Sequence, residues 1–324
     1  MTLASHGIVY AMDDRPELIE ALGKIGPILA HMRRADFSQV PESVRDKIDI
    51  VVTTGGSGAK ADLINGLPNL GIIACWGTGY ENVDLNAAAA RGVKVTYSPG
   101  ANAASVADLA VALMLDSIRR VSFCDRFVRS GEWDDPASQR PQRMKGVTGR
   151  KVGVLGLGEI GWKIAKRLDA FETEVCYHNR RLRPDAPWRY FDKLIDMARH
   201  CDVLMVALRA DASNRRIVNA EILDALGPDG HVVNITRGSV IDEPALIAAL
   251  QDGRIAGVGL DVFEREPHVP EALRHLPNVV LTPHMGGGAI EAALAMSNAV
   301  MQNVEAYIGG KALPHPVPEM AALG

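Results

Sequence analysis

The chain has 324 residues, 47% of them hydrophobic and 23% charged, and its formal net charge at pH 7 is −4. This length is too great for one ordinary core, so two domains are expected. The small net charge excludes a general electrostatic attraction to nucleic acid or to an anionic membrane. The N-terminus lacks the pattern of a signal peptide, no apolar stretch reaches roughly 18 residues, and the four cysteines form no CxxC pair. We therefore expect a cytoplasmic protein with reduced thiols, outside membranes and without nucleic acid as a partner.

The N-terminal third alternates short apolar runs with helical patterns. Strands are expected at Ile8–Met12, Ile28–Ala30, Ile48–Thr53, Leu70–Cys75 and Val93–Tyr97, and helices at Pro16–Leu22, Ala59–Asn65 and Leu85–Arg91. This alternation is typical of a small parallel α/β unit. A long helix, Ala103–Arg120, follows; it is apolar on most faces and is expected to be buried. The polar, proline-containing stretch 133–149 indicates a loop.

The stretch 151–181 carries the clearest motif of the chain. An apolar strand leads directly into Gly156-Leu157-Gly158-Glu159-Ile160-Gly161, and helical spacing and a second strand, Glu174–Tyr177, come next. The first glycine permits the tight turn, the second lets the backbone approach a pyrophosphate, and the third lets the helix pack closely on the strand. The free N–H groups at the helix start then face the phosphates. This context predicts a dinucleotide site.

The end of the second strand indicates which dinucleotide binds. An NAD site carries an acidic residue about 20 residues after the glycines, where it bonds the ribose 2′-hydroxyl. This chain has Asn179-Arg180-Arg181 there, with Arg183 just beyond. Guanidinium groups bind a 2′-phosphate that a carboxylate repels, so NADP(H) is favoured and NAD(H) is the weaker alternative. A solvated basic loop is the other reading of this segment.

The rest of the chain continues the α/β rhythm. Strands are expected at Val203–Leu208, His231–Ile235, Ile255–Asp261 and Val279–Leu281, and helices at Arg189–Arg199, Ala220–Leu226, Pro244–Asp252 and Glu291–Tyr307. The proline-rich tail is too short for a third domain and is expected to pack back on the first unit. The predicted fold class is therefore α/β, with two doubly wound parallel-sheet domains. A Rossmann NADP(H)-binding domain, residues 99–290, is inserted into a flavodoxin-like substrate domain made of residues 1–98 and 291–324.

Three polar residues that suit hydride transfer follow strands of the second domain. Arg237 lies in NITRG, Glu266 in DVFEREP and His284 in LTPHMGG. A guanidinium fork can hold the carboxylate and carbonyl of a 2-keto acid together. The alkoxide left by hydride transfer needs a proton from a group that titrates near neutral pH, and a carboxylate beside an imidazole favours its protonated form. From the pattern alone, Arg237 and His284 could equally be capping or surface residues.

The sequence resembles the D-isomer-specific 2-hydroxyacid dehydrogenase family from about Ile48 to Tyr307. The matching motifs, in the family's order, are WGTGYENVDL (76–85), NAASVADLAVALML (102–115), GLGEIG (156–161), NITRGSVIDEPALIAAL (234–250), GLDVFEREP (259–267) and LTPHMGG (281–287). The resemblance implies that Arg237 binds substrate, that His284 is the acid–base and that Glu266 orients it. It also implies that the backbone of the loop Trp76–Gly79 binds the substrate carboxylate and that Asn102 lies at a domain hinge.

The resemblance also yields two sets of binding residues. The coenzyme set is Gly156, Leu157, Gly158, Glu159, Ile160, Gly161, Asn179, Arg180, Arg181, Leu208, Ile235, Thr236, Arg237, Asp261, His284 and Gly286. The substrate set is Thr54, Trp76, Gly77, Thr78, Arg237 and His284. No metal is expected, because the histidines lack an HExxH or a paired metal spacing.

Departures from the family pattern narrow the expected function. The ending Asn179-Arg180-Arg181 and the sequence Leu208-Arg209-Ala210-Asp211 are similar to the glyoxylate/hydroxypyruvate reductase branch, which favours NADPH. That similarity implies reduction of a small 2-keto acid to the D-2-hydroxy acid. Trp76 replaces a small residue, so its indole either narrows the site toward small acids or offers a face to an aromatic one such as phenylpyruvate. A nucleotide-sensing, corepressor-like binding protein is the alternative of another class.

The family is usually dimeric, so a homodimer is expected. The helix Ala103–Arg120 is a candidate core of that contact, and Trp133 is a candidate for crossing the interface.

Overall fold

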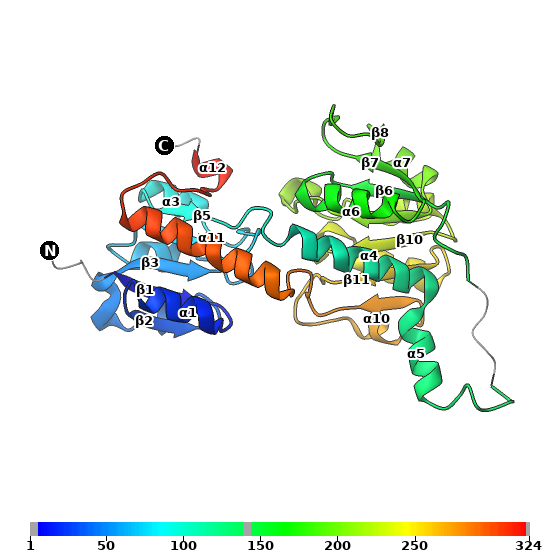
Figure 1. The fold of residues 1–324 in the computed structure, drawn as a ribbon, viewed down its shortest axis with the longest axis horizontal. Helices are drawn as coiled ribbons and strands as arrows, with labels where there is room; N and C mark the ends of the chain where they lie inside the picture. The colour runs from blue at the N-terminus through cyan, green and yellow to red at the C-terminus, as the bar shows by residue number, and fades with distance from the viewer. Residues whose placement is uncertain (1–5, 139–143, 322–324) are drawn as a thin grey trace. The chain divides into compact units, whose positions relative to one another are not determined.

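The computed structural model describes residues 6–138 and 144–321. Two compact units divide the chain: unit 1 comprises Met1–Asn102 and Ala289–Gly324, and unit 2 comprises Ala103–Gly288. Each unit contains one parallel β-sheet with helices on both faces (Figure 1). In the part of the chain that is described, no helix is long and apolar enough to cross a membrane.

Unit 1 is built on a five-stranded parallel sheet in the order β2-β1-β3-β4-β5. The strands are β1 (Gly7–Ala11), β2 (Ile28–Met32), β3 (Ile48–Thr53), β4 (Ile72–Cys75) and β5 (Lys94–Thr96). Strand β1 is buried along its whole length, as expected for a central strand covered on both faces. The helices are α1 (Pro16–Gly23), α2 (Ala61–Gly66), α3 (Leu85–Ala90), α11 (Ile290–Ile308) and α12 (Pro318–Ala321).

The two faces of this sheet have separate apolar cores. Helices α1 and α11 cover one face through Leu18, Leu22, Val300 and Val304. Helices α2 and α3 cover the other face. The proline-rich tail packs back on this unit as expected, because the Val317 N–H donates to the Val95 carbonyl at 3.0 Å.

Unit 2 is built on a seven-stranded parallel sheet in the order β12-β11-β10-β9-β6-β7-β8. Its strands are β6 (Lys151–Leu155), β7 (Glu174–His178), β8 (Arg189–Phe191), β9 (Val203–Val206), β10 (His231–Asn234), β11 (Gly257–Leu260) and β12 (Val279–Leu281). Its helices are α4 (Ala103–Arg119), α5 (Val121–Arg129), α6 (Glu159–Asp169), α7 (Leu194–His200), α8 (Ala220–Leu226), α9 (Glu243–Gln251) and α10 (Glu271–His275). The strand order reverses between β6 and β9, which is where doubly wound sheets bind ligands. The predicted fold class is confirmed.

The long apolar helix α4 is buried as predicted, and its partners lie within unit 2. Together with α6 it covers one face of the sheet, while α7, α8 and α9 cover the other. Its exposed positions are Ala104, Asp108, Ala112 and Arg119. The apolar face of α4 is therefore already used, which leaves little of it for contact with a second copy.

One local prediction differs from the structure, and one helix was not predicted. The helix predicted at Arg189–Arg199 is wrong: Arg189–Phe191 is the edge strand β8, and the helix starts only at Leu194. Tyr190 and Phe191 pair with Tyr177 and His178 of β7, and aromatic residues suit a pleated sheet. Helix α5 was not predicted from the sequence. This helix begins after Arg120, whose positive φ of 52° separates it from α4. It extends away from the sheet of unit 2 (Figure 1).

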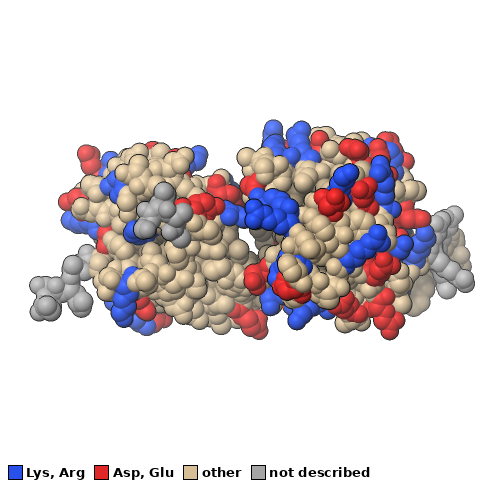
Figure 2. Space-filling view, turned by 90° about the horizontal axis from the view of Figure 1, so that it is seen from above, with Lys and Arg blue, Asp and Glu red and all other residues tan. Residues whose placement is uncertain are grey.

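Basic and acidic side chains are interspersed on the face of the molecule seen in Figure 2. This distribution agrees with the small net charge of the sequence.

Candidate active site

The three glycines of the loop after β6 have the three different surroundings that the motif requires. Gly156 has a φ of 99°, and a Cβ there would lie 2.4 Å from the Leu208 Cα. A Cβ on Gly161 would lie 1.9 Å from the Gly156 carbonyl oxygen, so α6 approaches the strand too closely for any side chain. A Cβ on Gly158, by contrast, would meet no described atom within 4 Å. The second glycine thus faces open space.

The start of helix α6 fits a phosphate. Gly158 is the N-cap residue, and no side chain of the described chain caps the helix there. The first N–H groups of a helix lack partners within the helix and carry its positive dipole end. The open space at Gly158 and these N–H groups therefore fit the pyrophosphate of a dinucleotide.

The segment after β7 contains both engaged and available polar groups. The Asn179 Oδ1 accepts the Leu157 N–H at 2.7 Å, and the Arg183 Nη1 donates to the Leu157 carbonyl at 2.9 Å. Arg180 and Arg181 are exposed, and neither makes a hydrogen bond or an ion pair with any described residue. These two guanidinium groups are therefore available to a ligand.

The loop that carries Arg237 is held by a buried asparagine. The Asn234 Oδ1 accepts the Thr236 N–H at 3.0 Å and the Thr236 hydroxyl at 2.8 Å, and its Nδ2 donates to the Arg237 carbonyl at 3.0 Å. Gly238 follows without a side chain because a Cβ there would lie 1.9 Å from the Phe263 carbonyl carbon. This close approach places the Arg237 loop against the loop that leads to Glu266.

Glu266 and His284 form a hydrogen-bonded pair. The His284 Nδ1 lies 2.7 Å from the Glu266 Oε2, and the other carboxylate oxygen accepts the Phe263 N–H at 3.1 Å. The hydrogen bond and charge of Glu266 raise the pKa of His284 above its ordinary 6.5, despite burial and the positive charge of Arg237. Burial raises the pKa of Glu266, but the hydrogen bond and charge of His284 and the charge of Arg237 outweigh it and leave that pKa below 4.5. The pair is therefore arranged to favour the protonated form of the imidazole.

The buried carboxylate of Asp261 holds the backbone that carries His284. Its Oδ1 accepts the Thr282 hydroxyl and the Met285 N–H, both at 2.6 Å, and its Oδ2 accepts the Gly286 N–H at 2.8 Å. His284 itself adopts a φ of 55°, which is uncommon for a residue with a side chain. Asp261 thus acts, within this unit, as an anchor for the loop that carries His284.

In unit 1, the predicted substrate residues lie in the loops after β3 and β4. The Thr54 Oγ1 accepts the Ser57 N–H at 3.0 Å, and the Thr78 hydroxyl donates to the Asn102 Oδ1 at 2.8 Å. The Gly77 φ of 114° turns the second loop. Among the residues that the structure describes, the backbone N–H groups of Thr78 and Gly79 have no hydrogen-bond partner. They are therefore free to bind a carboxylate.

The Trp76 indole packs inside unit 1. Its Nε1 donates to the Ser297 hydroxyl on α11 at 3.0 Å, and the Arg15 guanidinium lies 4.8 Å from the ring centroid. The indole is therefore held by α11 and by Arg15, two partners that sequence patterns did not indicate.

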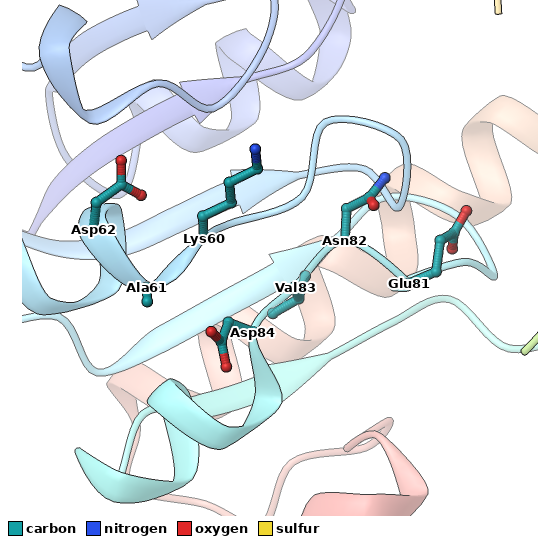
Figure 3. Close-up of a pocket in the computed structure, with 7 residues that line it drawn as sticks. All are labelled: Lys60, Ala61, Asp62, Glu81, Asn82, Val83 and Asp84. Atoms are coloured by element: carbon teal, nitrogen blue, oxygen red, sulfur yellow. The ribbon is translucent and has the colours of Figure 1, made fainter. Parts of the chain in front are cut away.

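A separate surface pocket of about 490 Å³ lies on unit 1, between the start of α2 and residues 81–84 (Figure 3). None of the predicted site residues lines it. The Asp84 carboxylate instead accepts the Ala87 N–H at the start of α3, which is a structural role.

Three other predicted coenzyme residues have different surroundings. The Leu208 backbone lies against Gly156, the Ile235 side chain is buried in the core, and Gly286 accepts the Ser105 hydroxyl at 2.7 Å. Sequence reasoning did not assign a role to Asn234. An asparagine at the end of a strand, just before Thr-Arg-Gly, is a turn signal that could have pointed to it.

Three features of the structure define a nucleotide-dependent oxidoreductase. They are the doubly wound sheet, the glycine loop suited to a pyrophosphate, and the Arg, Glu and His side chains at neighbouring strand ends. Comparison with known proteins specifies the family. The model of the D-isomer specific 2-hydroxyacid dehydrogenase NAD-binding domain matches residues 111–286. The chain belongs to the D-isomer specific 2-hydroxyacid dehydrogenase family, and it is an NAD(P)-dependent enzyme of that class.

Three relatives illustrate the similarity. The chain is 43% identical to glyoxylate/hydroxypyruvate reductase A of Arabidopsis thaliana over 97% of this chain and 100% of that protein. It is 41% identical to hydroxyphenylpyruvate reductase of Plectranthus scutellarioides, over 84% of this chain and 86% of that one. The crystal structure of NADPH-dependent glyoxylate/hydroxypyruvate reductase from Sinorhizobium meliloti, in complex with NADP and malonate, is 37% identical with a TM-score of 0.90 and covers 97% of both chains. The family resemblance noted in the sequence is confirmed.

Proposed function

We propose that this enzyme uses NADPH to reduce a small 2-keto acid of the glyoxylate or hydroxypyruvate type to the corresponding D-2-hydroxy acid. The proposed preference for NADPH rests on the exposure of Arg180 and Arg181. Both are exposed at the end of β7 and have no hydrogen-bond or ion-pair partner in the described chain. Two guanidinium groups favour a 2′-phosphate, whereas an acidic residue at this place favours the free ribose hydroxyl. The names of two similar proteins, from Arabidopsis thaliana and Sinorhizobium meliloti, agree with this substrate class.

The bound nicotinamide supplies the hydride for this reaction. Arg237 binds the carboxylate and the carbonyl oxygen of the keto acid through its guanidinium fork, and so aligns the carbonyl and stabilises the developing negative charge. His284 donates the proton from its Nε2 to that oxygen, because its Nδ1 is held by Glu266. Unit 2 binds the coenzyme, and the loops of unit 1 at Thr54 and at Trp76–Gly79 bind the substrate.

A second candidate substrate class is an aromatic 2-keto acid. The similarity to hydroxyphenylpyruvate reductase favours it. The position of the Trp76 indole against Arg15 and Ser297 favours the small acids, since a ring fixed in this way is not free to rearrange around an aromatic substrate.

A homodimer is part of the proposal. Val121 and Val128 of α5 are 58% and 49% exposed, and Trp133 just beyond is 56% exposed. Three large apolar side chains on one extended segment suit contact with a second copy of the chain. Replacing Val121 and Val128 by Asp should yield a monomer in sedimentation analysis, and a dimer that persists in this variant would exclude α5 from the interface.

The coenzyme proposal is tested by replacing Arg180 and Arg181 together by Ala. Dissociation constants for NADPH and NADH, measured by nucleotide fluorescence, are expected to separate: NADPH weakens by about a hundredfold or more, from the loss of two charge-assisted contacts, and NADH changes little. Equal weakening of both nucleotides would exclude recognition of the 2′-phosphate by these arginines.

A further inference from the structure

The peptide unit of Leu157, between the first two glycines of the loop, is bound from both sides by the segment after β7. Its N–H donates to the Asn179 Oδ1 at 2.7 Å, and its carbonyl accepts the Arg183 Nη1 at 2.9 Å. The Leu157 side chain is buried in the core of unit 2. Every polar backbone group of this residue is therefore satisfied by protein, and its orientation is set by two side chains more than 20 positions away in the sequence.

Arg183 is held in place by several further contacts. Its Nε and Nη2 donate to the carboxylate of Asp185 at 3.1 and 2.6 Å, and its guanidinium lies 4.5 Å from the centroid of the Trp162 ring. Its main-chain N–H donates to the Tyr177 hydroxyl at 3.0 Å. Three of the five N–H donors of this guanidinium are already engaged, and Asp185 occupies its Nε–Nη2 edge, so this edge cannot bind a phosphate with two parallel hydrogen bonds without breaking these contacts.

Arg180 and Arg181 lie between Asn179 and Arg183 in the sequence and differ from both. They are exposed, and no described residue forms a hydrogen bond or an ion pair with them. The short segment 179–183 thus contains two kinds of polar side chain: an outer pair bound to the glycine loop and an inner pair open to solvent.

We propose that Asn179 and Arg183 are positioning residues that hold the Leu157 peptide, and with it the Gly158 backbone, in the orientation that receives the coenzyme pyrophosphate. They set the affinity for nicotinamide dinucleotides with or without a 2′-phosphate. This inference assigns Asn179 a different role from the neighbouring arginines. The inference rests on the binding of a dinucleotide by the glycine loop. From the proposed function it uses only the recognition of the 2′-phosphate by Arg180 and Arg181, with which the role of Asn179 and Arg183 is compared.

The physical reason is the geometry of the loop. Gly156 has a φ of 99° and Gly158 faces open space, so on either side of the buried Leu157 the backbone lacks the steric restraint that side chains provide. Two hydrogen bonds, one of them charge-assisted, replace that restraint. Without them the loop samples other conformations, and the fraction competent to bind a pyrophosphate falls, which weakens every ligand that needs it by the same factor.

The test compares matched arginine substitutions with three ligands. Arg183→Met keeps an aliphatic stem over Trp162 but removes the donors, and Arg181→Met makes the same change at an exposed position two residues away. The ligands are NADPH, NADH and 2′-AMP, which carries the 2′-phosphate but has no pyrophosphate. Dissociation constants come from nucleotide fluorescence and, for 2′-AMP, from displacement of NADPH.

Arg183→Met is expected to weaken NADPH and NADH by the same factor, about tenfold, and to leave 2′-AMP within about twofold of the wild type. Arg181→Met is expected to weaken NADPH and 2′-AMP but not NADH. Asn179→Ala, which removes the other hydrogen bond to Leu157, should reproduce the Arg183→Met pattern. A merely structural defect would weaken all three ligands together, so the unchanged affinity for 2′-AMP separates positioning from misfolding.

Several outcomes would overturn the inference. If Arg183→Met and Asn179→Ala weaken NADPH and 2′-AMP while NADH is unaffected, both residues are ligands of the 2′-phosphate. If the two variants bind all three ligands like the wild type, or weaken all three equally, the hydrogen bonds to Leu157 do not position the loop. If the proposed role of Arg181 in NADPH preference is wrong, the Arg181→Met variant will bind NADPH as tightly as the wild type. The effect of Arg183→Met and Asn179→Ala on NADH affinity still tests the positioning role in that case.

Discussion

The charge of Glu266 should determine how keto-acid reduction by this enzyme depends on pH. Both oxygens of its carboxylate are used, one by the His284 Nδ1 at 2.7 Å and one by the Phe263 N–H at 3.1 Å. In Glu266→Gln, a single amide oxygen can serve only one of these donors. The variant therefore loses the negative charge and one hydrogen bond while its volume is almost unchanged.

The direction of the effect follows from the raised pKa of His284. Its largest cause is the hydrogen bond to Glu266, so removing the carboxylate lowers the pKa of the imidazole toward or below its ordinary 6.5. In the proposed mechanism, reduction needs the protonated imidazole as the proton donor. The alkaline limb of the profile of kcat/KM against pH should therefore move to lower pH in the variant, while the acidic region changes much less.

The magnitude is limited by solvent. A hydrogen bond to a charged group contributes about 1.5–3 kcal/mol when it is shielded. The side chains of His284 and Glu266 are 47% and 34% exposed, so screening reduces the interaction to about 1 kcal/mol. Since about 1.4 kcal/mol corresponds to a factor of ten, the rate of reduction at alkaline pH should fall about fivefold relative to the wild type.

The assay is a pH series of keto-acid reduction by both proteins at saturating coenzyme. An alkaline limb at the same pH in both proteins would refute the view that Glu266 sets the protonation of His284. A uniform loss at every pH would show instead that Glu266 acts only by orienting the ring.

The same pair gives a prediction about stability. His284 has a raised pKa, so its contribution is complete below 6.5 and is lost as the pH rises through the raised value. Glu266 has a lowered pKa, so its contribution is complete above 4.5 and is lost as the pH falls through the lowered value. The difference in unfolding free energy between the wild type and Glu266→Gln should therefore be largest between pH 4.5 and 6.5 in denaturant titrations, and a difference that is constant with pH would contradict this.

Four further substitutions test other parts of the site. Arg237→Ala should abolish most turnover while leaving the dissociation constant of NADPH near normal; turnover like that of the wild type would remove Arg237 from the mechanism. Asp261→Asn places an amide group against an N–H of the loop that carries His284, so it should destabilise the fold by about 1–3 kcal/mol and lower kcat more than it raises KM; unchanged stability and kcat would show that this carboxylate does not anchor His284. Gly161→Ala should unfold the protein at a much lower temperature, because its Cβ would lie 1.9 Å from a carbonyl oxygen, whereas Gly158→Ala should leave the melting temperature nearly unchanged and weaken NADPH and NADH binding. Equal melting temperatures for the two alanine variants would contradict the assigned glycine roles.

Local patterns predicted those parts of the molecule that depend on neighbours in the sequence. The apolar run of Ile48–Thr53 became β3 with the same limits, and α8 began and ended at the predicted residues 220 and 226. The surroundings of the glycines in 156–161 also followed from spacing alone, because the strand, turn and helix are contiguous.

Features set by distant partners were not predictable in the same way. The edge strand β8 exists because Tyr190 and Phe191 pair with β7, and the same residues in isolation fit a helical pattern. The Trp76 indole binds Ser297, which is 221 residues away. The bonds from Asn179 and Asp261 to backbone groups of other loops likewise appear only when the chain is folded.

The central claim is that this enzyme reduces small 2-keto acids with NADPH. The most direct test is to follow the loss of absorbance of the reduced nicotinamide, with NADPH and separately with NADH, across glyoxylate, hydroxypyruvate and phenylpyruvate. We predict the highest kcat/KM for NADPH with glyoxylate or hydroxypyruvate. A higher kcat/KM with NADH would contradict the proposed coenzyme, and a higher kcat/KM with phenylpyruvate than with both small acids would contradict the proposed substrate. Absence of turnover with all three acids, together with tight NADPH binding, would favour a nucleotide sensor instead.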